Sequence, residues 1–130
     1  MKINRKKHTF PVDETNDFKK KMLDWATDLA QKDTSGDNQT KPVFYLDSNH
    51  HKDTYSQFKA LVGLGSVQEL KANQKDSFKA LYEFHRECSD WLLGYLCYDL
   101  KNEVEDLESA NDDLQQTPEL YFFQPVKLVI

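Results

Sequence analysis

The longest apolar run of the chain, Trp91–Tyr98, is far shorter than the stretch of about 20 apolar residues that spans a bilayer as a helix. It consists of aromatic residues, leucines, one glycine and one cysteine, with Asp90 before it and Asp99 after it. A short apolar run between polar residues is typical of a buried β-strand. We therefore predict that this segment is a central strand of a sheet.

Two longer segments have apolar residues at helical spacing. The first runs from Asp13 to about Lys32, and Asp13 is expected to accept hydrogen bonds from the first backbone N–H groups. The second runs from Asp76 to about Ser89. The predicted packing faces are Phe18, Met22, Trp25 and Leu29 in the first helix, and Phe78, Leu81, Tyr82 and His85 in the second. A short acidic helix, capped by Asp99, is expected to carry Leu100, Val104 and Leu107 on one face.

The remaining apolar segments are short and rich in strand-forming residues. They are Pro42–Ser48, Phe58–Gly65, Ser66–Lys71, Leu120–Phe123 and Val126–Ile130. Gly63 and Gly65 permit a turn, so we expect a hairpin between the second and the third of these segments. Strands mixed with two main helices predict an α+β fold with a mostly antiparallel sheet.

The sequence ends in the apolar segment Lys127–Ile130. A strand at the end of a domain normally has partners for its backbone and its side chains. We therefore expect residues 1–130 to be a single N-terminal domain of a longer protein. Exposed strand edges would also allow the isolated chain to form a homodimer.

The chain carries 22 acidic and 17 basic side chains, a formal net charge of -5. Such a charge disfavours nucleic acids and anionic membranes as partners. No apolar stretch follows the basic segment Met1–His8, so no secretory signal is expected and the predicted location is the cytoplasm. Eight phenylalanines, six tyrosines and two tryptophans can supply a core, which argues against disorder. The two cysteines, Cys88 and Cys97, are too few for a disulfide framework and are expected to stay reduced.

Three groups of residues could suggest a metal site, and each has a simpler interpretation. His50 and His51 are adjacent, and neighbouring side chains in an extended segment point to opposite sides. His85 and Cys88 have a helical spacing that zinc could use, but no second pair completes four ligands. An acidic group lacks the spacing of a calcium loop and is expected on a solvated helix face: Glu103, Glu105, Asp106, Glu108, Asp112 and Asp113. We predict no catalytic residue and no metal site, and the role of His50 and His51 stays open.

Two segments are more specific. The segment Gly94-Tyr95-Leu96-Cys97-Tyr98-Asp99-Leu100, followed by Glu103, resembles the Gly-Tyr-x-Gly-Tyr-Asp…Glu signature in the N-terminal region of anthranilate synthase and aminodeoxychorismate synthase large subunits. Phe44–Ser48 resembles the strand-end Leu-x-Ser element of the same region. The order and separation of both, with Pro118–Phe123 after them, match this family from about Pro42 onward. Two departures are Cys97 in place of a glycine, and Asp90-Trp91 where two glycines are often found.

The resemblance implies the N-terminal segment of a two-part, chorismate-using enzyme. In this family a large C-terminal domain binds chorismate and magnesium, and a glutamine amidotransferase subunit delivers ammonia. The N-terminal segment packs against that domain in a β-sandwich and helps to form a tryptophan pocket. By the resemblance, the pocket residues here are Leu46, Asp47, Ser48, Phe58 and Lys59, and the signature residues Gly94, Tyr95, Tyr98 and Asp99 are structural. No cofactor is expected in this chain itself.

Asp47 distinguishes between the two branches of the family. It stands where the anthranilate synthase form, Leu-Leu-Glu-Ser, has a glutamate, so the aminodeoxychorismate (para-aminobenzoate) branch is favoured. Two alternatives stay open: the equivalent region of anthranilate synthase with a feedback site for tryptophan, and a free-standing ligand-binding module.

Overall fold

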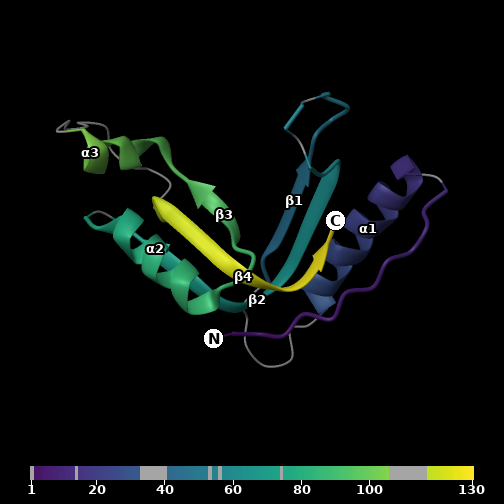
Figure 1. Ribbon diagram of the computed structural model, residues 1–130, viewed down its shortest axis with the longest axis horizontal. Coiled ribbons are helices and arrows are strands. Elements are labelled where there is room, and N and C mark those ends of the chain that lie inside the picture. Colours follow the sequence, from purple (N-terminus) through teal and green to yellow (C-terminus); the bar gives the residue numbers. More distant parts are fainter. Residues whose placement is uncertain are drawn as a thin grey trace. The chain divides into compact units, whose positions relative to one another are not determined.

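The computed structural model describes residues 2–13, 15–32, 41–52, 54–55, 57–73, 75–105 and 117–130. Its elements follow one another as helix α1 (Thr15–Lys32), strands β1 (Val43–Asp47) and β2 (Ala60–Ala72), helix α2 (Ser77–Cys88), strand β3 (Leu93–Leu96), the 3-10 turn η1 (Tyr98–Leu100), helix α3 (Lys101–Val104) and strand β4 (Leu120–Val129) (Figure 1). Among these elements, no helix is long and apolar enough to cross a membrane.

The described strands form a sheet in the order β1-β2-β4-β3. β1 is antiparallel to β2, with Val43 opposite Leu64 and Asp47 opposite Ala60. β3 is antiparallel to β4, with Leu93 opposite Phe123. The predicted α+β fold with an antiparallel sheet is therefore confirmed. The larger β-sandwich remains a prediction, because no second sheet is found among the described residues.

The chain divides into two compact units. One consists of Met1–Ile3 and Val67–Gln124, and the other of Asn4–Ser66 and Pro125–Ile130. The boundaries fall inside β2 and inside β4, so each of these strands contributes to both units.

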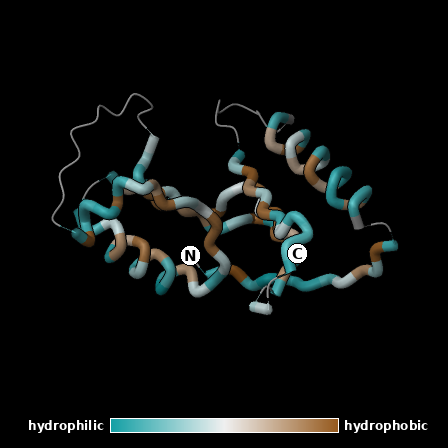
Figure 2. The backbone as a smooth tube through the Cα atoms, turned by 90° about the horizontal axis from the view of Figure 1, so that it is seen from above, coloured by the Kyte–Doolittle hydropathy of each residue, from teal (hydrophilic) through white to brown (hydrophobic). Residues whose placement is uncertain are grey.

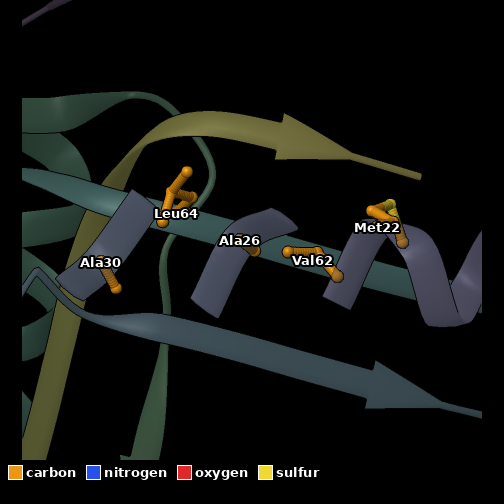
Figure 3. Packing of buried hydrophobic residues seen from close by; sticks show 5 residues of the cluster. All are labelled: Met22, Ala26, Ala30, Val62 and Leu64. Atoms are coloured by element: carbon orange, nitrogen blue, oxygen red, sulfur yellow. The ribbon is translucent and has the colours of Figure 1, made fainter. Parts of the chain in front are cut away.

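In the unit that contains α1, the core lies between this helix and β2. Met22, Ala26 and Ala30 lie on the face of α1 that packs toward Val62 and Leu64 (Figure 3). Small alanine side chains allow the helix to approach the strand closely. Around this cluster pack Leu29, Val43, Tyr45 and Val129.

The packing face predicted for α1 is only partly right. Met22 and Leu29 belong to the core or its border, but Phe18 is 43% exposed and Trp25 is 42% exposed. The helix instead buries Ala26 and Ala30, which are not part of the predicted face. Trp25 instead lies at the edge, where the ammonium of Lys127 is 5.3 Å from its ring centroid.

In the other unit, Leu93, Leu100, Leu120 and Phe123 are buried, together with Ser77 and Cys88 at the two ends of α2. The side-chain amide of Gln68 on β2 lies beside Sγ of Cys88 at the end of α2. The face predicted for α2 is wrong for three of its four residues, since Phe78, Tyr82 and His85 are exposed. Along both main helices apolar and polar residues alternate (Figure 2), as expected of helices that bury one side.

The predicted hairpin between Phe58–Gly65 and Ser66–Lys71 is wrong. β2 continues through both segments as one strand. Gly65 has a φ of +64°, and its N–H donates to the carbonyl of Pro42 at 2.9 Å, so the positive φ is accommodated within the sheet without reversing the chain. The segments Leu120–Phe123 and Val126–Ile130 likewise belong to one strand, β4.

The predicted central strand Trp91–Tyr98 is also corrected. β3 covers only Leu93–Leu96 and lies at an edge of the sheet, paired with β4. Asp99 lies inside the turn η1, and Cys97 occupies the cap position before it. The predicted strand Pro42–Ser48 is β1, but it is an edge strand with partly exposed side chains and is not buried. The end of the predicted acidic helix at Leu107 lies outside the described residues.

Candidate functional site

The end of β1 and the start of β2 are held together by main-chain hydrogen bonds. The N–H of Ser48 donates to the carbonyl of Lys59 at 2.9 Å, and the N–H of His51 donates to the carbonyl of Ser48 at 2.8 Å. Asn49 and His50 have φ values of 49° and 62°, a left-handed conformation that these residue types adopt more readily than most. The chain therefore turns sharply just after the Leu46-Asp47-Ser48 element.

The carboxylate of Asp47 anchors this strand end to α1. Its Oδ1 accepts hydrogen bonds from Nζ of Lys19 and from the N–H of Asn49, both at 2.9 Å, and its Oδ2 accepts one from the hydroxyl of Tyr45. The Tyr45 hydroxyl, then Lys19 and Asn49, hold the pKa of Asp47 well below its usual range, and the same hydrogen bond raises the pKa of Tyr45. Asp47 is thus an ionised structural group rather than an acid that could donate a proton near neutral pH.

We expect both Tyr45→Phe and Lys19→Met to raise the pKa of Asp47, with Tyr45→Phe having the larger effect. A folded-state pKa below the unfolded value of about 3.9 stabilises the fold above that pH. This contribution is lost as the pH falls through the lower, folded-state pKa. An NMR titration of the Asp47 carboxyl carbon measures the shift directly. Lys21→Met removes an exposed lysine of the same helix and should leave the titration unchanged, and an unchanged titration in Tyr45→Phe would contradict the expectation.

Beside this anchor lies an open hollow with a volume of about 550 Å³. It is lined by Asp13, Asn16, Lys19, Ser48, His50, His51, Lys52 and Lys59. Three of these side chains are lysines, two are histidines, and one, Asp13, is a carboxylate. His50 and His51 do not lie in an extended segment, for which opposite directions were expected; they follow the sharp turn after β1, and both line this hollow. The residues that the structure describes include no group of three or more His, Cys, Asp or Glu side chains that could hold a metal ion.

The five residues that the resemblance assigns to a tryptophan pocket all lie at this strand end, but the structure separates them. Ser48 and Lys59 line the hollow. Asp47 is engaged with Lys19 and Tyr45, while Leu46 (55% exposed) and Phe58 (38% exposed) are exposed apolar side chains outside the lining.

Gly94 of the signature occupies a position where no side chain fits. It lies opposite Phe122, and a Cβ built on it would be 1.9 Å from the carbonyl oxygen of Tyr121 and 2.7 Å from Cα of Phe122. Tyr95 packs its ring against that of Tyr121, with centroids 5.8 Å apart. Burial, with the negative charge of Glu69 as a second cause, raises the pKa of Tyr121 to about 12. Gly94 and Tyr95 therefore have structural roles in the β3–β4 pair.

The other two signature residues are exposed. Tyr98, a structural residue by the resemblance, is 81% exposed, and the ammonium of Lys101 lies 4.4 Å from its ring centroid. Asp99 is also exposed, in η1. β3 ends at Leu96, and Tyr98 and Asp99 follow it in the turn η1. The signature is continuous in the sequence from Gly94 to Leu100, so no local pattern marks this end of the strand.

Two groups interpreted from the sequence have different roles in the structure. Cys88 is buried and His85 is exposed, so they do not form a ligand pair. Glu103 was expected on a solvated face, but its carboxylate accepts hydrogen bonds from both the hydroxyl and the N–H of the buried Ser77, the latter at 3.0 Å. It thereby caps the start of α2. Asp106, Glu108, Asp112 and Asp113 lie outside the described residues.

Comparison of the chain with protein-family models, with curated proteins and with solved structures returns no match.

Proposed function

We propose that this chain is the N-terminal, non-catalytic region of a chorismate-using enzyme similar to aminodeoxychorismate synthase component I. The observation that carries the proposal is Gly94, the first residue of the signature, which lies against the backbone of β4 with no room for a side chain. Such a position explains in physical terms why a motif of this kind begins with glycine. The Leu46-Asp47-Ser48 element is the second part of the resemblance. It supports the proposal because it lies at the end of β1, as the family element lies at the end of a strand.

In this proposal the chain serves as a partner surface for the catalytic domain. Several large apolar side chains on the strands are at least half exposed, namely Leu46, Leu96 and Val126, and Ile130 just after β4 is exposed as well. In the proposed full-length enzyme, these side chains would be covered by the catalytic domain. Chorismate and magnesium would bind to the catalytic domain, and ammonia would come from a glutamine amidotransferase subunit. The cytoplasm remains the proposed location.

Ser48 and Lys59 are the proposed polar contacts for tryptophan at the strand end. A lysine ammonium can pair with the carboxylate of an amino acid, and a serine hydroxyl can donate to it. Leu46 and Phe58 offer apolar surface nearby. Because the strand end is open, the catalytic domain would have to supply the remaining walls of the pocket.

Transcript sequencing beyond the codon for Ile130, followed by assays of the encoded protein, tests the proposal. We expect the reading frame to continue into a chorismate-binding domain. The encoded protein should consume chorismate with magnesium and ammonia, whereas residues 1–130 should not. Formation of 4-amino-4-deoxychorismate supports the favoured branch, and formation of anthranilate supports the alternative. A stop codon directly after Ile130, or a longer product that leaves chorismate untouched, would overturn the proposal.

Tryptophan binding provides a second arm of the same test. By calorimetry, the encoded protein should bind tryptophan at least tenfold more tightly than residues 1–130, because the chain alone encloses the ligand incompletely. Ser48→Ala should weaken binding in the encoded protein, and the exposed control Thr117→Ala should not. Equal, tight binding by both proteins would argue instead for a free-standing ligand-binding module.

A further inference from the structure

We propose that the hollow between α1 and the β1–β2 end binds a phosphate group, either as inorganic phosphate or as part of a small phosphate ester. This inference goes beyond the proposed function and does not depend on it. It rests on the residues that line the hollow, which come from three segments: the start of α1, the turn after β1, and the residue before β2.

The lining of the hollow contains more lysines than carboxylates, although the chain as a whole is negatively charged. The whole sequence has a net charge of -5, yet the lining of this hollow includes three lysines, Lys19, Lys52 and Lys59, and one carboxylate, Asp13. Lys19 is paired with Asp47. Lys52 and Lys59 make no ion pair with another residue in the described part of the chain. A concave surface with an excess of cations attracts small anions.

The neutral side chains of the lining also suit an anion. Ser48 and Asn16 each carry a polar group that can donate a hydrogen bond. The donors come from three segments of the chain, and they include no arginine. Lysine binds phosphate as a point charge, and a tetrahedral oxyanion can accept from donors around its whole surface. The donor set therefore suits a tetrahedral phosphate group.

The backbone that carries these donors is held in place on both sides of the hollow. The Ser48–Lys59 and His51–Ser48 hydrogen bonds fix the turn, and the Lys19–Asp47 contact ties α1 to the same strand end. A volume of about 550 Å³ is much larger than one phosphate ion. It falls within the range of about 300–1,000 Å³ of small-molecule sites, so an organic group attached to the phosphate would also have room.

Titration of the chain with inorganic phosphate tests the inference, with amide chemical shifts as the readout and sodium chloride at matched ionic strength as the reference. We expect saturable shifts confined to the turn after β1 and the start of α1, with a millimolar or lower Kd. The variant Lys52→Gln/Lys59→Gln should weaken binding at least tenfold. The control Lys20→Gln/Lys21→Gln makes the same change in net charge on exposed lysines of α1 outside the hollow, and should change the Kd less than twofold.

A second titration with phenyl phosphate distinguishes the two sources of the phosphate group. Tighter binding of the ester indicates that the organic part also contacts the hollow, and equal binding indicates inorganic phosphate. Shifts that do not saturate, or equal losses in the two double variants, would overturn the inference, because both outcomes indicate diffuse charge attraction only. The single variant Lys52→Gln repeats the comparison if the double variant loses the dispersed spectrum of a folded chain. Lys52 is outside the proposed tryptophan contacts, so its result leaves the enzyme proposal untouched.

Discussion

Replacing Gly94 by alanine is expected to destabilise the chain by about 3 kcal/mol, at the upper end of what overpacking costs. The added methyl would overlap the carbonyl of Tyr121 and the backbone of Phe122. Backbone atoms cannot rotate away as a flexible side chain can, so β3 and β4 would have to separate. Their pairing from Leu93–Phe123 to Leu96–Leu120 would be weakened along its whole length.

Urea unfolding followed by far-UV circular dichroism measures this effect as a lower midpoint. Gly65→Ala is the matched control, since its new methyl would meet Val126 Cγ2 at an ordinary 3.4 Å. Its cost is the left-handed backbone alone, about 1–2 kcal/mol. If Gly94→Ala unfolds at the same urea concentration as the unaltered chain, the close approach of β3 to β4 is not present in solution.

Replacing Glu103 by alanine is expected to cost about 2–3 kcal/mol, the range for losing hydrogen bonds to a charged group at a buried site. The hydroxyl and the N–H of Ser77 both donate to this carboxylate, and Ser77 is fully buried. Asp76, at the cap position of α2, makes no side-chain capping bond and has a φ of 61°. Without Glu103, the first turn of the helix would lose its acceptor.

Glu103→Gln keeps one carbonyl oxygen and should lose less stability than Glu103→Ala. Glu105→Ala removes an exposed carboxylate two positions later and serves as the control, with an expected change below about 0.5 kcal/mol. Chemical denaturation gives these energies, and faster hydrogen exchange of the Ser77 amide in Glu103→Ala locates the effect. Equal stability of the Glu103 and Glu105 variants would show that the cap does not contribute.

The helices could be predicted from the sequence because their patterns are local. α2 begins one residue after the predicted Asp76, and α1 ends at the predicted Lys32. The strand pattern was interpreted less well for a physical reason. Glycine at a positive φ usually marks a turn, and Gly65 takes that conformation inside a strand of 13 residues, far longer than the usual five or six.

The residues of the candidate site also fall into two groups: those that the sequence indicates, and those that only the folded chain brings together. Ser48 and Lys59 were named from the resemblance, whereas Lys19 and Asn16 join them only because α1 packs beside the end of β1. Likewise, no local pattern could pair Glu103 with Ser77, since the contact spans 26 positions of the chain. Contacts of this kind depend on the assembled fold, and a single sequence contains no spacing rule for them.

The strand order β1-β2-β4-β3 has a consequence for biosynthesis. A ribosome releases β2 and β3 well before β4, the strand that lies between them in the finished sheet. Until Leu120–Val129 leaves the exit tunnel, the nascent chain can form α1 with β1 and β2, but the inner edges of β2 and β3 have no neighbour. Long-range pairing of this kind folds slowly and exposes strand edges to aggregation. The nascent chain should therefore depend on chaperones most strongly in the interval between synthesis of β3 and synthesis of β4.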